Sequence, residues 1–294
     1  MLIPILRPCW KRPAILKLSL EYQQEAVDLD KFITVFVVDY PQRDEIMRVI
    51  GDYKPPKAVI LRSQWYNLTR SILEAYKWIF EEFKTDMVVT IEEDAIIAKD
   101  FLKLALWFRE NPISQEVLTL NSGWLEELAV RQDDNKLHKI NWHFPVAIGV
   151  MREMFEKYVL PHCHEGYYNN AGEYLWEHFP DIWEKGYNTG QAGLFNRIRI
   201  KNNLQVLCPE VRRAGHIGVY GFFQGGNKFG ELSETVKYEV LKQYACDGTF
   251  LWQLGEGQNP DNFVDFNPNT DFKALYIEEN TKFREDDLLF HYPL

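Results

Sequence analysis

Three consecutive acidic residues are the feature of this sequence best suited to chemistry. Glu92, Glu93 and Asp94 directly follow an apolar, β-branched run, Met87 to Ile91, which is typical of a buried parallel strand. Open α/β sheets bind ligands at the carboxyl ends of their strands, where these carboxylates are expected. Adjacent carboxylates repel one another unless a cation or solvent relieves the repulsion, and Mg²⁺ and Mn²⁺ bind carboxylate and phosphate oxygens alike. The run therefore predicts either a metal–diphosphate site or a solvated acidic loop.

The usual glycine-rich phosphate loops are absent from the sequence. No GxGxxG follows the first apolar segment, residues 2–6, and no GxxxxGK[ST] occurs anywhere. The residues that follow that segment are Arg7-Pro8-Cys9-Trp10-Lys11-Arg12-Pro13. A metal ion held by acidic residues is the other common way to bind a diphosphate. The missing loops therefore favour the metal interpretation of the acidic run.

Composition bounds the class of protein. The 294 residues are 46% hydrophobic and 15% aromatic, which is enough to bury a large core. A net charge of −10 argues against non-specific binding to nucleic acid or anionic membrane. No apolar stretch approaches the roughly 20 residues of a membrane helix, and basic residues follow the first apolar segment instead of preceding it, so we expect a cytoplasmic protein. The four scattered cysteines form no CxxC pair and are expected to be reduced thiols.

Alternating strand and helix patterns over the first 110 residues predict an α/β fold whose parallel sheet is built of βαβ units. Asn67 is a suitable N-cap for the most amphipathic helix. The predicted strands are 2–6, 33–39, 57–61, 87–91, 117–120, 146–150 and 205–207, and the predicted helices are 13–30, 67–83, 99–109, 151–160 and 232–245. No Pro/Ser-rich linker divides the chain, so one globular unit is expected.

Three segments together resemble a known family. The order of residues from Glu92 to Phe101, an acidic strand end followed by a short apolar stretch and an Asp-Phe helix start, is similar to the Glu-Asp-Asp region of GT-A nucleotide-sugar glycosyltransferases. Tyr76-Lys77-Trp78 resembles their Tyr-Arg-Trp, and Cys208 to Gly218 resembles a later Cys, Pro-Glu-(Val/Ile)-Ser-Arg segment. The likeness is greatest to the N-acetylglucosaminyltransferases that extend N-glycans or O-mannosyl glycans, and it covers roughly residues 2–220.

The resemblance implies a GT-A fold, which is a Rossmann-like, mostly parallel sheet flanked by helices with an acceptor-binding C-terminal half. Residues 1–110 would form the nucleotide-sugar-binding half, 111–245 the acceptor and catalytic half of the same domain, and 246–294 a loop-rich extension. It also implies a metal-dependent inverting transfer of a sugar from a nucleotide sugar, a UDP-sugar by likeness, to a hydroxyl of a glycan or another acceptor. Mn²⁺ or Mg²⁺ would be the cofactor.

Several site residues are carried over by position in these motifs. Asp94 matches the acid that binds the metal directly, and Glu92 and Glu93 match partners that orient ribose, sugar or metal-bound water. His216, between glycines 215 and 218, matches a further metal ligand; a lone His is otherwise a satisfied surface or core residue. Asp39 follows the second strand and either accepts hydrogen bonds from the base or ribose or only forms a turn.

Four arginines are candidates for phosphate binding through their forked donors. Arg7, with Pro8 beside it, follows the first strand, and Arg70 lies at the start of a helix. Arg212 and Arg213 precede His216 and would neutralise the leaving diphosphate. For Arg70, Arg212 and Arg213 the alternative is ordinary surface charge.

The general base departs from the family pattern. The family's spacing places the base within Gln191 to Leu194, a segment without an acid. We favour Glu173 instead, because Gly172-Glu173 resembles the helix start of other inverting GT-A enzymes, with Asp181 and Glu184 in reserve. An acid that merely favours a helix N-terminus is the alternative for Glu173.

Two other functions fit parts of the sequence. A nucleotidyltransferase also places metal-bound acids on a Rossmann-like sheet, although it usually has a glycine-rich loop after the first strand. A non-catalytic carbohydrate-binding protein is the second, and the missing acid near Gly193 supports it. A nucleic-acid acceptor is disfavoured by the net charge of −10.

Overall fold

The computed structural model describes residues 2–122, 137–182, 189–209, 213–217, 232–247 and 288–289. Among them, a nine-stranded mixed sheet has the order β11-β7-β9-β6-β8-β4-β1-β2-β3, and β10 pairs with β5 in a second, two-stranded sheet. The strands are β1 (Ile3–Cys9), β2 (Phe32–Val38), β3 (Lys57–Leu61), β4 (Met87–Ile91), β5 (Ala95–Ile97), β6 (Val117–Asn121), β7 (Leu137–Ile140), β8 (Ala147–Met151), β9 (Gln205–Pro209), β10 (Ala214–His216) and β11 (Leu288–Leu289).

Strand direction confirms the predicted βαβ pattern. β3, β2, β1 and β4 are neighbours in that order and all run parallel. β8 is antiparallel to both β4 and β6, and β9 is parallel to β6. The predicted architecture, a mostly parallel sheet between helices, is therefore confirmed. The carboxyl ends of β1, β2 and β4 lie at one edge of the sheet.

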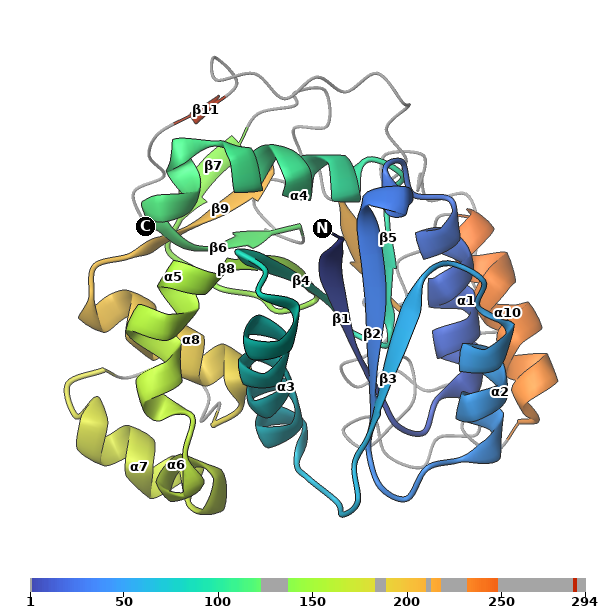
Figure 1. Cartoon of the computed structure of the whole chain (residues 1–294), viewed down its shortest axis with the longest axis horizontal. Helices are drawn as coiled ribbons and strands as arrows, with labels where there is room; N and C mark the ends of the chain where they lie inside the picture. The colour runs from blue at the N-terminus through green and yellow to red at the C-terminus, as the bar shows by residue number, and fades with distance from the viewer. Residues whose placement is uncertain are drawn as a thin grey trace.

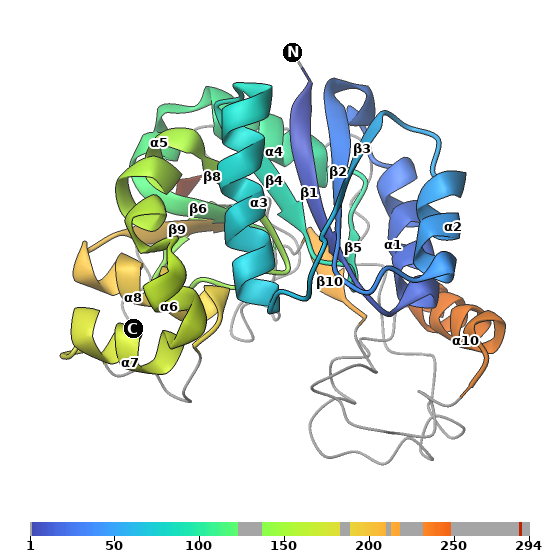
Figure 2. The same cartoon turned by 60° about the horizontal axis from the view of Figure 1, so that its bottom comes forward.

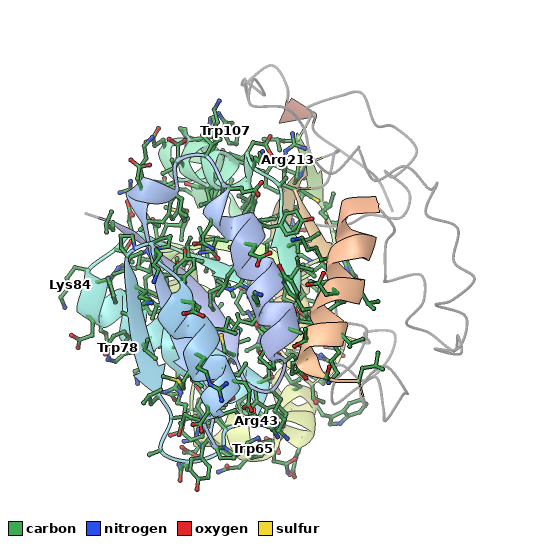
Figure 3. The ribbon with its side chains drawn as sticks, turned by 90° about the vertical axis from the view of Figure 1, so that its right-hand side faces the viewer. Arg43, Trp65, Trp78, Lys84, Trp107 and Arg213 are labelled. Carbon is green, nitrogen blue, oxygen red and sulfur yellow. The ribbon has the colours of Figure 1, made fainter. Side chains whose placement is uncertain are left out.

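Helices cover both faces of the sheet (Figure 1). α3 and the helices α5 to α8 lie on one face; α1, α2 and α4 lie on the other, and α10 packs beside α1 (Figures 1 and 3). Their bounds are α1 (Pro13–Gln24), α2 (Asp44–Asp52), α3 (Leu68–Phe83), α4 (Phe101–Glu110), α5 (Arg152–Met154), α6 (Glu165–Asn169), α7 (Ala171–His178), α8 (Gln191–Lys201) and α10 (Glu234–Asp247), with short 3₁₀ or π segments at Leu29–Lys31, Pro112–Gln115, Phe155–Val159 and Leu160–His162.

β4 lies at the centre of the core because its two faces contribute to two apolar clusters. Val88 belongs to the cluster that includes residues of α3 and α8. Val89 and Ile91 belong to the cluster that includes residues of α4 and β5. All five residues of β4 are buried, which confirms the predicted buried strand. The packing on both faces of the sheet depends on this strand.

Several elements differ from the sequence prediction. The helix expected over 13–30 ends at Gln24, and Asp28 takes a left-handed backbone conformation with a φ of 66° before the short helix that leads into β2. The helix expected over 151–160 divides into α5 and then π and 3₁₀ turns at a proline, Pro161, which has no backbone N–H to continue it. The N-cap prediction is confirmed: Asn67 accepts a hydrogen bond from the Arg70 N–H at 2.8 Å.

The nine-stranded sheet includes strands from both predicted halves of the chain, and the boundary near residue 110 stays a prediction. Apart from 246–247 and β11, the predicted extension lies outside the described residues. Among the described helices, none has the length and apolar character needed to cross a membrane. Cys9, Cys163 and Cys208 are buried free thiols, as predicted for them.

Candidate functional site

The three acids form a turn between β4 and β5, which we call the acid turn (Glu92, Glu93 and Asp94); Glu93 and Asp94 are buried and Glu92 is half-buried. The Ala95 N–H donates to the Glu92 carbonyl at 3.1 Å and closes the turn. The Glu92 N–H donates to the Val146 carbonyl at 3.0 Å, and the Ile217 N–H donates to the Asp94 carbonyl at 2.7 Å. The backbone of the turn is therefore held from both sides, and in Figure 2 the ends of β4, β5 and β10 come together.

Arg12 holds both inner carboxylates of the acid turn. Its Nε lies 2.5 Å from Glu93 Oε1, and its Nη1 lies 2.6 Å from Asp94 Oδ2. The other Glu93 oxygen accepts the Trp10 N–H at 2.7 Å. Glu93 and Asp94 are only 6% and 5% exposed. Burial alone would lower the pKa of Arg12, but the charges of Asp94 and Glu93 outweigh burial and raise that pKa. The guanidinium is therefore a permanent cation between two buried anions.

Local sequence explains why Arg12 reaches the acid turn. Arg12 is the N-cap residue of α1, and Pro13 occupies the first helical position, where its fixed φ favours a helix start. The loop from Trp10 to Arg12 therefore lies at the carboxyl end of β1. Because β1 and β4 are direct neighbours in the sheet, that loop lies beside the turn that follows β4. No sequence motif identified Arg12 as this partner, although the basic loop after the first strand was the signal for it.

Arg7 lies inside the protein, behind the acid turn. Its side chain is fully buried and donates from Nη2 to Ser19 Oγ at 2.6 Å. Its Nε and Nη1 have no hydrogen-bond partner among the described atoms. Burial lowers the pKa of Arg7, and the charges of Glu93 and Asp94 are among those that oppose the shift. Pro8 is buried in β1 as well. The structure thus places Arg7 as a buried counter-charge and not as an exposed phosphate ligand.

Asp39 lies at the same edge, directly after β2. It is 8% exposed, and Ser71 donates a hydrogen bond to its Oδ1 at 3.2 Å. Burial raises the pKa of Asp39 to about 6, against the opposing effects of the Ser71 hydrogen bond and the charge of Arg62. The negative charge of Glu93 adds to the increase. The second strand and the acid turn therefore contribute carboxylates that interact electrostatically.

His216 and Arg213 lie at opposite ends of β10 and have different neighbours. His216 pairs with Ala95 across β10 and β5, so its backbone lies beside the residue that follows Asp94; its side chain lies outside the described residues, as does Arg212. Arg213 is fully buried and binds Asp100 Oδ2 through Nε at 2.9 Å. Figure 3 shows Arg213 at the end of the molecule where Trp107 lies, opposite Arg43 and Trp65. Arg213 thus braces the start of α4, away from the acid turn.

The remaining candidates lie on α3 and the α6–α7 region. Arg70, in the first turn of α3, pairs through Nη1 and Nη2 with the carboxylate of Glu165 on α6 and lies 4.5 Å from the ring centroid of Tyr66. Glu173 is exposed on α7 and accepts a hydrogen bond from Asn170. Asp181 is exposed after α7, and Glu184 lies outside the described residues. Neither Glu173 nor Asp181 has a described hydrogen bond to the acid turn.

Carboxylate oxygens are the ligands that hard divalent cations prefer, and the acid turn offers two buried carboxylates. Both of them now pair with the Arg12 guanidinium. In the described part of the chain, no group of three or more His, Cys, Asp or Glu side chains is arranged to hold a metal ion. A metal ion at Glu93 and Asp94 would therefore share these oxygens with Arg12 or displace it.

No protein-family model and no curated protein matches this chain. Three solved structures are similar at low identity. A Pyrobaculum calidifontis mannosyltransferase in complex with GDP-Man and Mn²⁺ has 12% identity and a TM-score of 0.47 over 92% of this chain and 68% of its own. Mouse xyloside xylosyltransferase 1, in its apo form, has 10% identity and a TM-score of 0.44 over 70% and 84%. S. aureus TarS has 14% identity and a TM-score of 0.45 over 70% and 58%.

Asp39 gives the site a measurable pH signature. Its folded pKa lies above the ordinary 3.8, so its contribution to stability is full below about pH 4 and is lost as pH rises through about 6. We expect a carboxyl ¹³C titration near pH 6, assigned by its absence in Asp39→Asn. The Ser71→Ala variant should titrate higher still, because it loses a hydrogen bond that favours the ionised form. A titration near pH 3.8 in both proteins would refute this account of the site.

Proposed function

We propose that this chain is a GT-A glycosyltransferase that transfers a sugar from a nucleotide sugar, by likeness a UDP-sugar, to an acceptor hydroxyl with inversion. The observation that carries the proposal is the pair of buried carboxylates in the acid turn, Glu93 and Asp94, which attract a positive charge; here that charge is the Arg12 guanidinium. It lies at the carboxyl ends of parallel strands, the edge at which open α/β sheets bind ligands. The resemblance of the segments around residues 76, 92–101 and 208–218 supplies the reaction class.

Donor recognition would draw on Asp39 and the acid turn together. Asp39 is a buried acceptor at the end of β2 and is suited to hydrogen bonds from ribose hydroxyls or a base N–H. Burial raises the pKa of Asp39 to about 6, because it removes solvent from the ionised carboxylate. A ribose hydroxyl of the nucleotide sugar would donate a hydrogen bond in place of that solvent. Glu92 would orient the ribose or the transferred sugar.

Asp94 and Glu93 would hold the divalent ion, Mn²⁺ or Mg²⁺, with His216 as a further ligand. Such an ion, when bound, neutralises charge that develops on the leaving diphosphate. Two sets of backbone contacts support this proposal: the acid turn is fixed by hydrogen bonds to Val146 and Ile217, and His216 pairs with Ala95. Rigid placement of the carboxylates is what such a site requires.

Glu173 is our candidate for the general base, with Asp181 in reserve. An exposed carboxylate on α7 can accept the proton of an acceptor hydroxyl that binds over that helix. Arg70 supports the arrangement by pairing α3 with Glu165 of α6, the helix that directly precedes α7. In this proposal Arg70 is a positioning residue, and Arg7 and Arg213 stabilise the interior.

The Asp94→Asn variant tests the proposed function. We expect transfer or hydrolysis of a nucleotide sugar, assayed over a panel of UDP- and GDP-sugars with Mn²⁺, to fall about 100-fold or more. The reason is that a bound metal ion stabilises the charge on the leaving group by several kcal/mol, and Asp94 is the residue proposed to hold that ion. Asp86→Asn is the control: Asp86 is exposed, lies just before β4 at the opposite end of the strand, and pairs with Arg109 at 2.8 Å. Equal turnover in native protein and Asp94→Asn would reject the proposal, and pyrophosphate release from nucleoside triphosphates would indicate a nucleotidyltransferase.

Glu173→Gln separates the base from donor binding. We expect kcat for transfer to fall about 100-fold or more while the KM for the donor stays unchanged, because general-base catalysis contributes roughly 10²–10⁴-fold. Glu177→Gln, one turn later on α7 and also exposed, is the control and should leave kcat unchanged. If Glu173→Gln has native kcat, the base lies elsewhere and Asp181→Asn is the next variant.

A further inference from the structure

We propose that Arg12 competes with the divalent metal ion for Glu93 and Asp94, so that the metal binds together with the donor and not before it. The coupling to the donor rests on the proposed function, whereas the competition itself rests only on the described contacts. No motif of the sequence assigns a role to Arg12; the structure does so through its two ion pairs.

The contacts show what a metal ion must displace. Of the four carboxylate oxygens of Glu93 and Asp94, Glu93 Oε1 and Asp94 Oδ2 accept from Arg12 at 2.5 and 2.6 Å. Glu93 Oε2 accepts from the Trp10 backbone at 2.7 Å. A metal ion that uses Glu93 and Asp94 through these oxygens therefore takes positions that Arg12 and Trp10 now fill. Two cations on the same oxygens repel each other, so one weakens the binding of the other.

Burial makes this competition strong. Glu93 and Asp94 are almost inaccessible to solvent, and the Arg12 side chain is only 22% exposed. Water can therefore do little to replace whichever counter-charge leaves the carboxylates. Arginine also keeps its proton under all ordinary conditions, so a change of pH does not relieve the competition. The free site should consequently have a low affinity for metal alone.

Arg7 adds a second positive charge behind the turn. It is fully buried, two of its guanidinium nitrogens have no hydrogen-bond partner among the described residues, and its charge interacts with those of Glu93 and Asp94. The two inner carboxylates thus interact with two arginine charges, Arg12 by direct ion pairs and Arg7 at longer range. A divalent ion alone would add excess positive charge, whereas an ion that arrives with a nucleotide diphosphate brings its own compensating negative charge. This balance is the reason to expect metal and diphosphate to bind cooperatively.

Manganese titration followed by the electron paramagnetic resonance of free Mn²⁺ tests the competition without any assay of activity. We expect Arg12→Gln to bind Mn²⁺ at least about tenfold more tightly than the native protein in the absence of nucleotide, a difference of about 1.4 kcal/mol. Arg109→Gln, which removes the pairing partner of the exposed Asp86, is the control and should match the native protein. Equal Mn²⁺ affinity in Arg12→Gln and native protein would overturn the competition.

The coupling is tested by repeating the titration with UDP. UDP should raise the Mn²⁺ affinity of the native protein at least about tenfold and that of Arg12→Gln by less. This measurement on the native protein stands even if the variant does not fold, and a native affinity that UDP leaves unchanged would overturn the coupling. Sugar transfer with no effect of Arg12→Gln on Mn²⁺ binding keeps the proposed function and rejects the inference. Tighter Mn²⁺ binding by the variant with no turnover of any nucleotide sugar keeps the competition and rejects the function.

Discussion

Two buried carboxylates that follow a central strand need a counter-charge, and the arrangement around β4 depends on how that need is met. Glu93 and Asp94 repel each other and are almost completely removed from water. Arg12 meets both, from the loop that leads from β1 into α1. This contact joins two neighbouring βα connections across the edge of the sheet. Loss of Arg12 would leave uncompensated buried charge, which is among the more costly defects in a protein interior.

The same constraint relates the fold to the proposed chemistry. β4 is buried on both faces where it joins the two core clusters, so its charged residues can only follow its end. There the backbone of the acid turn is fixed by hydrogen bonds to Val146 and Ile217, and His216 is brought alongside by β10. A pair of carboxylates that attracts cations therefore lies on a backbone held by hydrogen bonds from both sides, which is the kind of placement that precise catalysis requires.

Much of the architecture could be predicted from the sequence because it rests on local patterns. The apolar run of β4, the amphipathic spacing of α3 and the Asn67 cap each specify their element within a few residues, and the structure confirms all three. The acid turn was located correctly because it immediately follows such a run. The short strands β5 and β10 were missed, since three-residue strands carry little periodicity and depend on pairing with a distant segment.

The contacts of the site residues could not be predicted from the sequence, because they depend on which distant strands become neighbours in the sheet. Arg12 and Asp94 are 82 residues apart and meet only because β1 and β4 are neighbours. Arg7 and Arg213 carry the forked guanidinium that suggests phosphate binding, yet both are fully buried. Arg7 donates a hydrogen bond to Ser19, and Arg213 forms an ion pair with Asp100. Residue type indicated the chemistry available to these side chains, whereas strand order determined which of them face the acid turn.

A crystal structure of the protein with Mn²⁺ and UDP, with the metal located by its anomalous scattering, tests the account most directly. The account predicts a manganese peak within coordination distance of an Asp94 carboxylate oxygen and of the UDP diphosphate, with the Arg12 guanidinium displaced from Asp94. A manganese ion and UDP bound elsewhere, with Arg12 still paired to Glu93 and Asp94, would contradict it.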